Sequence, residues 1–435
     1  TTGTTVDIDG NFVFNTAVPS DAVLVVTSIG YKTVKVPVGG GYVEVILQED
    51  TEMLDEVVMI GYGTQKKAVV SAAISTVGSE MLDKVAAVRV DDALKGLTPG
   101  VNVTSNDGQP GSGSSIRIRG IGTINDSNPL YVVDGMPVEN GIDYLAPGDI
   151  ERIDILKDAA SCAVYGTRGA NGVILINTKK GQVGKPKVTV RLEATNLHGL
   201  RFYDYINAAD YATLMNEASA VSGNVIPYSD EDIMKFRNHS DPYLYPDVDW
   251  TNEILKKNAF QTMDEISVSG GNDIVRYYIY LGYSSEDGLF KEDPTYDYRT
   301  NSRAQRYTFR TNVDVNLSKN LTLELGLSEI VQHRLYPGTD ASSIFYSLNM
   351  VKPLSYPVRN PDGTLAGSTT TYENNSPYRL ATNNGYAKQF RSTTQANATL
   401  RWDLGTLITP GLSLEAKFSY DHGYFTEAFR RKVPT

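Results

Sequence analysis

The sequence predicts a mainly β protein with three parts: a small N-terminal β-sandwich, a compact α+β domain, and the first strands of a large antiparallel transmembrane β-barrel. Two observations carry this prediction. The chain of 435 residues has 27 tyrosines and 38 glycines, which suits strands, turns and interfaces better than helical bundles. From about residue 186 onward, apolar and polar residues alternate strictly, as in strands with one apolar and one polar face.

Residues 1–50 have the pattern of a small all-β unit, which we expect to be the β-sandwich, truncated at its start. An Asp-Gly turn at Asp9 and Gly10 separates two strands, and alternating residues continue beyond it. Asp7, Asp9 and Asn11 have a spacing seen in calcium loops, but an EF-hand needs a further ligand at position 12 and a different glycine offset. A hairpin turn explains them better. Because the chain opens in mid-strand, we expect its N-terminus to be processed or truncated, with loss of a targeting segment.

Residues 51–67 form a segment that changes from acidic to apolar to basic without a turn of its own. Its centre, Val57–Ile60, is β-prone and is followed by a Gly-Tyr-Gly breaker. Two interpretations fit: an interdomain connector, or a peptide that adds as a strand to the edge of a partner's sheet.

Residues 68–185 predict a compact α+β domain. Apolar residues from Leu82 to Leu94 have helical spacing, which predicts a helix that ends at Gly96 or Pro99. Strand-like segments separated by Gly, Asn and Asp turns follow at 101–105, 115–120, 129–135, 150–158 and 172–180.

Residues 186–435 predict the barrel strands. The best example is 306–317, where apolar and polar residues occupy opposite faces. The apolar face holds Tyr307, Phe309, Val313, Val315 and Leu317, and the polar face holds Thr308, Arg310, Asn312, Asp314 and Asn316. We expect strands at 188–196, 262–270, 275–284, 306–317, 321–331, 388–404 and 412–424.

The connections between these strands are alternately long and short. Outer-membrane barrels have this arrangement, with long extracellular loops at one end and tight periplasmic turns at the other. A soluble sandwich has no reason to sort its loops by end. Seven strands cannot enclose a domain the size of residues 68–185, because a plugged lumen needs about 22 strands. We therefore expect the chain to be the N-terminal part of a longer protein.

Composition excludes other classes of function. The net charge is −11 and no basic run is present, so nucleic acid is not an expected partner. The 4 histidines are scattered without ligand spacing, and no nucleophile motif or paired carboxylates are seen. We expect no metal, no cofactor and no enzymatic activity. Cys162, the only cysteine, lies among alanines and is expected to be a small buried apolar residue.

Residues 54–181 resemble the plug of SusC/RagA-type TonB-dependent outer-membrane transporters. The resemblance lies in "LDEVVMIGYGTQKK", in "GVNVTSNDGQPGSGSSIRIRGIGTINDSNPLYVVDGMPV", and in "DIERIDILKDAASCAVYGTRGANGVILINTKKG". Residues 1–50 resemble the carboxypeptidase regulatory-like domain of this family, whose fold gives no ground for peptidase activity. The implied domains are 1–50, a linker at 51–67, a plug at 68–185, and barrel strands at 186–435.

The resemblance implies TonB-dependent active import of oligomeric nutrients, either glycan-derived oligosaccharides or oligopeptides, across the bacterial outer membrane. The implied partners are TonB with its ExbB/ExbD energising complex, outer-membrane lipid, and a SusD-like lipoprotein that acts as a lid. A dimer of transporter–lipoprotein pairs is left open. The TonB box, the segment that TonB would bind as an added strand, consists of Leu54, Asp55, Glu56, Val57, Val58, Met59, Ile60 and Gly61.

A displaceable plug favours polar contacts, which can rehydrate, over a dry apolar interface. Arg117 and Arg119 are expected to pair with carboxylates of the barrel wall, with Glu324 and Glu415 as candidates by facing. Salt bridges within the plug are the alternative, and the two do not exclude each other. The expected plug network is Arg117, Arg119, Glu151, Arg152, Asp154 and Arg168. Candidate substrate or lid contacts in the loops are Tyr243, Tyr245, Tyr372, Asn374 and Asn375.

Two other functions remain as alternatives. One is a single-chain TonB-dependent receptor of the siderophore or cobalamin type, which has no lipoprotein lid. The extra N-terminal β domain and the plug sequence argue against it. The other is a soluble adhesin or glycan-binding β protein, which predicts no sorting of loop lengths by end.

Overall fold

The computed structural model describes residues 4, 22–26, 34–37, 43–47, 57–60, 63–66, 74–85, 87–105, 108–123, 126–138, 141–142, 144–199, 202–367 and 376–432. The chain packs as two compact units, one of Thr1–Ile74 with Leu156–Ala170 and one of Ser75–Ile155 with Asn171–Thr435. The domain boundaries expected at 50, 67 and 185 stay predictions.

The first unit contains two short antiparallel strand pairs. β1 (Val23–Val26) pairs with β2 (Val34–Pro37), and β3 (Val57–Ile60) pairs with β4 (Gly63–Lys66). Most of the expected β-sandwich lies outside the described residues. The unit also holds the short helices α4 (Ala159–Cys162) and η3 (Ala163–Gly169). Cys162 is buried, as predicted.

The α+β part of the second unit is built on a five-stranded sheet. Its order is β5 (Ile74–Gly78), β10 (Ile150–Leu156), β11 (Val173–Thr178), β8 (Leu130–Val133) and β9 (Met136–Val138). β6 (Val101–Ser105) and β7 (Ser114–Ile118) form a separate antiparallel pair. All five strand-like segments expected here are strands. Their side chains form one apolar core with apolar residues of the segment 82–94, and Ile153, Ile155 and Ile174 are fully buried in it.

The single helix predicted between Leu82 and Pro99 is wrong. The structure has two one-turn helices, α2 (Ser79–Leu82) and α3 (Val90–Ala93), with Arg89 in an extended conformation before the second. Arg89 Nε lies 3.0 Å from Asp91 Oδ1, and the Asp91 carboxylate also accepts from the backbone N–H of Ser114 on β7 at 2.8 Å. This tertiary contact fixes the start of α3 as a separate helix. The apolar spacing therefore predicted which residues enter the core, but not that the helix is interrupted.

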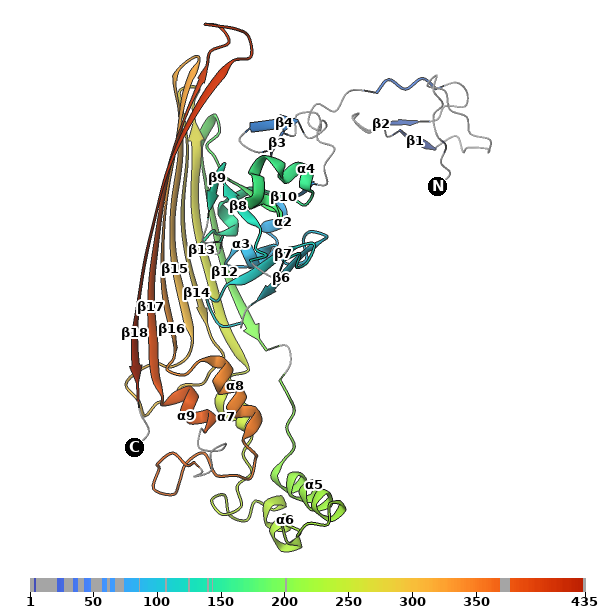
Figure 1. Ribbon diagram of the computed structural model, residues 1–435, viewed down its shortest axis with the longest axis vertical. Coiled ribbons are helices and arrows are strands. Elements are labelled where there is room, and N and C mark those ends of the chain that lie inside the picture. Colours follow the sequence, from blue (N-terminus) through green and yellow to red (C-terminus); the bar gives the residue numbers. More distant parts are fainter. Residues whose placement is uncertain are drawn as a thin grey trace. The chain divides into compact units, whose positions relative to one another are not determined.

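The rest of the second unit is one antiparallel sheet of seven strands in sequence order (Figure 1). Each strand pairs with the next along the chain, and all seven expected strands are present. They are β12 (Gly184–His198), β13 (Asn258–Gly271), β14 (Val275–Asp287), β15 (Arg303–Ser318), β16 (Leu321–Pro337), β17 (Gly385–Asp403) and β18 (Ser413–Arg431).

The connections are sorted by end, as predicted. Short connections join β13 to β14, β15 to β16 and β17 to β18, at the end where the chain leaves the plug and enters β12. The long connections at the opposite end carry the helices α5 (Ala208–Val221), α6 (Asp230–Arg237), α7 (Trp250–Ile254), α8 (Ala341–Met350) and α9 (Pro377–Thr382). No helix in the described part of the chain is both long enough and apolar enough to cross a membrane.

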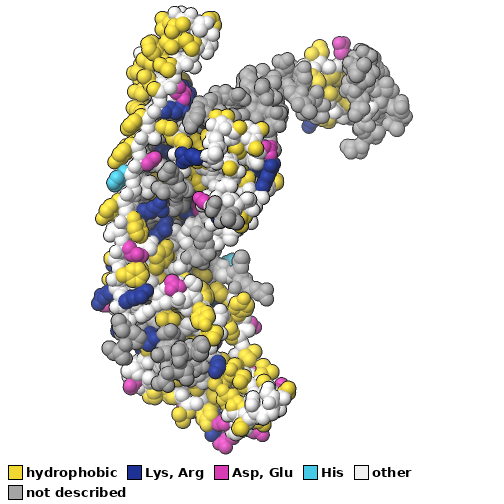
Figure 2. Space-filling view, viewed as in Figure 1, with side chains coloured by type: hydrophobic (Ala, Val, Ile, Leu, Met, Phe, Trp, Pro, Cys, Tyr) yellow, Lys and Arg dark blue, Asp and Glu magenta, His cyan; other side chains and the backbone are white. Residues whose placement is uncertain are grey.

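Burial on the sheet is the reverse of that in a soluble protein. On β15 the buried side chains are polar: Arg310 is 3% exposed, whereas the outward-facing Tyr307 and Leu317 are 46% and 55% exposed. Figure 2 shows yellow apolar side chains along the outer edge of the sheet. The large apolar side chains exposed on this face include Val188, Val190, Leu192, Leu281, Leu325, Leu327, Leu400 and Trp402. Such a surface is stable against lipid hydrocarbon and not against water.

An aromatic row crosses five strands on the outward face, toward the end with the long connections. Ring centroids are 5.0 Å apart for Tyr283 and Tyr307, 6.3 Å for Tyr307 and His333, 5.1 Å for His333 and Phe390, and 6.0 Å for Phe390 and Tyr424. From Tyr307 to Leu317, at about 3.4 Å per residue and a tilt of about 40°, the apolar stripe spans about 26 Å. That height matches the hydrocarbon band of an outer-membrane barrel with an aromatic girdle.

We predict that arginine on the outward face destabilises the barrel according to depth. Leu327→Arg, in the middle of the apolar stripe, is expected to cost about 2–4 kcal/mol, and Leu317→Arg, at its end, about 0–1 kcal/mol. Urea unfolding of the full-length protein in lipid vesicles measures both. Equal costs for the two variants would contradict a membrane-facing surface.

Candidate functional site: the interface between plug and barrel wall

The inward face of β15 provides the wall side of the candidate site. Arg306, Thr308, Arg310, Asn312 and Asp314 alternate along the strand and are each less than 9% exposed. Arg306 donates hydrogen bonds to the carbonyls of Val88 and Tyr144, and Asn312 donates to Thr178 and Lys179. The polar face predicted from alternation therefore lies against the plug.

A buried ion pair lies at the centre of this interface. Arg310 Nε donates to the carboxylate of Asp149, and the two side chains are 4% and 0% exposed. Asp149 ends the single turn η2 (Pro147–Asp149), which approaches the wall closely because its middle residue is Gly148. A Cβ on Gly148 would lie 2.4 Å from Glu265 Oε2 of β13. Burial raises the pKa of the Asp149 carboxyl, and the nearby Arg310 guanidinium opposes that shift.

The end of β11 is fastened to the wall by hydrogen bonds. Asn312 Nδ2 lies 2.9 Å from Thr178 Oγ1 and 2.7 Å from the Lys179 carbonyl oxygen. Thr178 in turn donates its backbone N–H and its hydroxyl to the carboxylate of Asp134, at 2.9 and 2.7 Å. The contact from the wall thus continues into the turn that follows β8.

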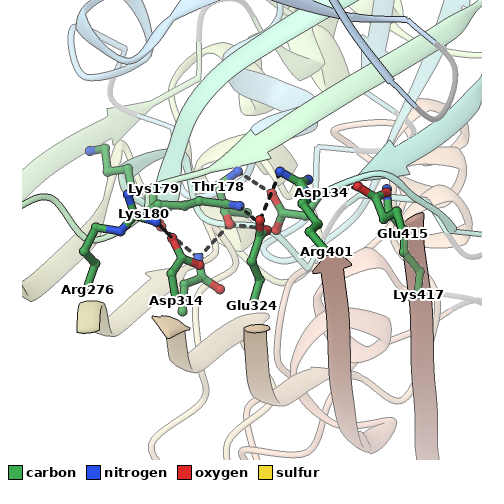
Figure 3. A network of polar contacts seen from close by, with 11 residues as sticks. Asp134, Thr178, Lys179, Lys180, Arg276, Asp314, Glu324, Arg401, Glu415 and Lys417 are labelled. Carbon is green, nitrogen blue, oxygen red and sulfur yellow. Dashed lines mark hydrogen bonds and ion pairs between the residues drawn. The ribbon is translucent and has the colours of Figure 1, made fainter. Parts of the chain in front are cut away.

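A chain of alternating charges extends from the plug across three wall strands (Figure 3). Lys180 Nζ lies 2.7 Å from Glu324 on β16, and Glu324 lies 3.1 Å from Arg401 on β17. Arg401 and Lys417 both pair with Glu415 on β18, at 2.7 and 2.8 Å. Although burial lowers the pKa of Lys180, the Glu324 carboxylate raises it above its ordinary value overall.

The loop around Pro110 is held at the opposite end of the wall, near the long connections. Tyr336 donates its hydroxyl to the Pro110 carbonyl at 3.0 Å, and Glu286 accepts the Gly111 N–H at 3.2 Å. Gly111 has a positive φ of 73°, and a Cβ there would lie 2.8 Å from Ala304 Cβ. Plug and wall therefore contact each other at three levels: at the Pro110 loop, at Arg310, and at Lys180.

The residues expected to form one polar network in the plug do not all contact one another in the structure. Arg117 donates to Asn128 and to the Ile116 carbonyl, so its contacts lie within the plug, but they are hydrogen bonds and not the salt bridges of the alternative hypothesis. Its expected pairing with Glu324 or Glu415 is wrong, because Lys180 and Arg401 pair with those carboxylates. The backbone of Arg119 has a positive φ of 55° and donates to Gly100.

The other members of that network lie on β10 and in the first unit. Arg152 pairs with Asp154 at 2.9 Å, and the fully buried Asp154 also accepts from Thr76. Glu151 is exposed on the same strand, and Arg168 belongs to η3 of the first unit. Their functional role stays a prediction.

The expected partner-binding residues are only partly described. In the TonB box, Val57, Val58, Met59 and Ile60 form β3, whereas Leu54, Asp55, Glu56 and Gly61 lie outside the described residues. Among the loop candidates, Tyr243 is 48% exposed, and Tyr245 packs on Phe236 with ring centroids 5.3 Å apart. Tyr372, Asn374 and Asn375 lie outside the described residues.

Sequence reasoning missed the residues on the plug side of the interface. Asp149, Lys180 and the Pro110 loop were not singled out, although Arg310 and Asn312 were placed on the polar face of their strand. One available signal for Asp149 was its place in a Pro-Gly-Asp turn before a buried strand. Within the described residues no cluster of His, Cys, Asp or Glu is arranged to hold a metal ion.

The fold and this interface define a plug domain and the first wall strands of a transmembrane β-barrel. Residues 66–173 match the family model of the TonB-dependent receptor plug domain. The chain is accordingly SusC/RagA-like, with the plug and first barrel strands of a TonB-dependent transporter of the bacterial outer membrane.

Three relatives illustrate the similarity. TonB-dependent receptor SusC of Bacteroides thetaiotaomicron is 36% identical over 67% of this chain and 28% of its own length. A TonB-dependent receptor of Formosa agariphila is 34% identical over 97% of this chain and 38% of its own. Among solved structures, the RagAB peptide importer in its open-open state has a TM-score of 0.67 at 25% identity, over 86% of this chain and 43% of that one. The chain thus spans less than half of these proteins.

We predict that the Arg310–Asp149 pair contributes most to holding the plug. Arg310→Leu leaves the buried Asp149 carboxylate without a partner and is expected to lower the free energy of plug opening by about 3–5 kcal/mol. Adding Asp149→Asn to the same chain should restore part of this loss. Hydrogen exchange of plug amides in the full-length protein measures this loss.

The matched control is Lys180→Gln. The Lys180 side chain is 44% exposed, so we expect a cost of at most about 1 kcal/mol. Equal loss of protection in the two single variants would show that the central pair has no special role.

Proposed function

We propose that this protein imports oligomeric nutrients across the outer membrane, with energy supplied through TonB. The observation that carries the proposal is the polar character of the interface between plug and wall. Among the described residues the apolar contacts are few: Ile330 joins the apolar core of the plug, and Tyr278 and Tyr280 pack with Ala146. Ion pairs and hydrogen bonds make the central contacts. Polar contacts can exchange their partners for water, so a pulling force can move the plug without exposing a large apolar surface.

TonB is proposed to pull on the segment Leu54–Gly61 by adding it as a strand to its own sheet. Among the described residues, Val57–Ile60 pairs with the short β4 alone, which supports the idea that this segment can exchange one pairing for another.

We further propose that a SusD-like lipoprotein covers the extracellular end. The first long connection exposes apolar side chains to water: Val221 is 90% exposed, Val225 91% and Leu244 75%. Figure 2 shows this yellow surface over α5 and α6. Apolar patches of this kind usually bind a protein partner. Oligosaccharides are the proposed substrates, and oligopeptides are the alternative, which the similarity to RagAB supports.

The test of this proposal is mass spectrometry of the full-length protein purified in mild detergent from its native outer membrane. A stoichiometric lipoprotein together with bound oligosaccharides or peptides is the expected result. Recovery of the barrel alone, or with a metal chelate, would instead favour a receptor without a lid.

We predict that Val58→Pro abolishes uptake and leaves surface binding of substrate unchanged. Proline lacks the N–H that strand addition requires. Cell-based uptake and surface-binding assays with the purified substrate measure the two quantities. Val58→Thr, which keeps both the N–H and the β propensity, is the matched control and should retain uptake. Uptake by the proline variant at the normal rate would exclude this segment as the TonB-binding strand.

A further inference from the structure

A cluster of cations and aromatic rings lies at the extracellular ends of β17 and β18. We call it the rim cluster. It consists of Lys388, Arg430 and Lys432 together with Tyr296, Tyr298 and Tyr386. The cations come from or directly follow the two strands, and two of the tyrosines come from the connection between β14 and β15.

The geometry of the rim cluster is that of repeated cation–π contacts. Lys388 Nζ lies 4.9 Å from the ring centroid of Tyr386, Arg430 Cζ lies 5.8 Å from that of Tyr298, and Lys432 Nζ lies 5.1 Å from that of Tyr296. The rings also contact one another, with centroids 5.6 Å apart for Tyr296 and Tyr298 and 5.7 Å for Tyr298 and Tyr386. The aromatic rings therefore hold three positive charges at one place.

None of these three cations pairs with a carboxylate in the described part of the chain. The Lys432 ammonium donates to the amide oxygen of Asn383, at 3.1 Å. Two carboxylates lie nearby but have other neighbours. Glu427 accepts a hydrogen bond from Gln389, and the charge of Asp297, in the connection between β14 and β15, interacts with Tyr298. Most other cations of this unit that lie near the wall, such as Arg310, Arg276 and Lys180, are paired with carboxylates. The chain has a net charge of −11, so a group of three cations without a carboxylate partner among the described residues is unusual in it. Such a group favours the binding of an anion.

The position of the rim cluster identifies the kind of anion. Lys388 lies two residues beyond Phe390 of the aromatic row, in the direction of the long connections, and both face outward. Arg430 lies six residues beyond Tyr424 in the same direction and on the same face. The cations thus lie just outside the hydrocarbon band, at the level of lipid headgroups of the outer leaflet. Basic side chains gather at the lower left edge of Figure 2, where β17 and β18 end.

We propose that the rim cluster binds the phosphate of a phosphorylated lipid headgroup in the outer leaflet. A guanidinium and two ammonium groups match the charge and the acceptors of a phosphate. The tyrosine rings offer apolar contact to the lipid on one side and hydroxyl groups to the headgroup on the other. The ligand would lie against the outer surface of the barrel, away from the path through the lumen, so the site is separate from substrate transport.

The test uses the full-length protein and a variant that removes all three charges, Lys388→Gln/Arg430→Gln/Lys432→Gln. Both are mixed with phosphatidylethanolamine vesicles that contain bisphosphorylated lipid A, and the lipid A retained per protein after repurification is measured. At low salt we expect retention on the order of a hundredfold weaker in the variant, since each cation near an anionic lipid surface contributes roughly a fivefold preference. Dephosphorylated lipid A should not be retained by either protein.

Two controls keep the result specific. Lys185→Gln/Lys187→Gln/Lys319→Gln removes the same charge at the opposite end of the sheet and should retain lipid A like the unmodified protein. Lys388→Arg/Lys432→Arg keeps the charge at the rim and should also retain it. Heat-modifiable migration on gels reports that each barrel is folded.

Four outcomes would overturn the proposal. One is equal retention by the triple rim variant and the unmodified protein. Another is an equal loss in the control at the opposite end. The third is complete displacement of lipid A by millimolar inorganic phosphate, which would indicate a site for soluble anions. Loss of a copurifying lipoprotein without loss of lipid A would likewise assign the cluster to a protein partner.

Discussion

The structure depends on one constraint: the inward face of the wall must be polar, because it contacts a plug that has to move. The Asp149–Arg310 pair is its centre, since both groups are removed from water and each is stable there only because of the other. Gly148 permits the close approach of that turn, and Asn312 extends the same contact to the end of β11. The alternation along β15 places these groups together on one face.

The same alternation determines the outer surface. A strand with a polar inner face of this kind has an apolar outer face, and on β15 that face extends from Tyr307 to Leu317. In water this surface would promote aggregation, whereas in lipid it fixes the depth of the barrel. The aromatic row then marks the outer boundary of the membrane. The polar groups that contact the plug and the apolar groups that contact the lipid are thus two results of a single sequence period.

The sequence alone could predict the features that depend on local periodicity. All seven barrel strands, the sorting of the connections and the five strand segments of the plug follow from alternation and turn residues. The break between α2 and α3 could not be predicted, because it depends on Arg89, Asp91 and Ser114, which are brought together by the tertiary fold. The partner of Arg310 could not be predicted for the same reason. Arg310 and Asp149 are 161 residues apart in the sequence, and no local pattern encodes their contact.

The three levels of contact between plug and wall differ in how strongly each one opposes displacement of the plug. Lys180 lies four residues before β12, so the chain itself keeps this part of the plug near the wall even when its pair with Glu324 is broken. The Pro110 loop is held by single hydrogen bonds to a carbonyl and an N–H, which water can replace at little cost. At Asp149 separation breaks a fully buried ion pair, and the nearby Arg306 loses its hydrogen bonds to the carbonyls of Val88 and Tyr144. Resistance of the plug to displacement is therefore greatest in the middle of the wall. The contact at the Pro110 loop exchanges easily with water, and the contact at Lys180 stays close to the wall because the chain connects it to β12.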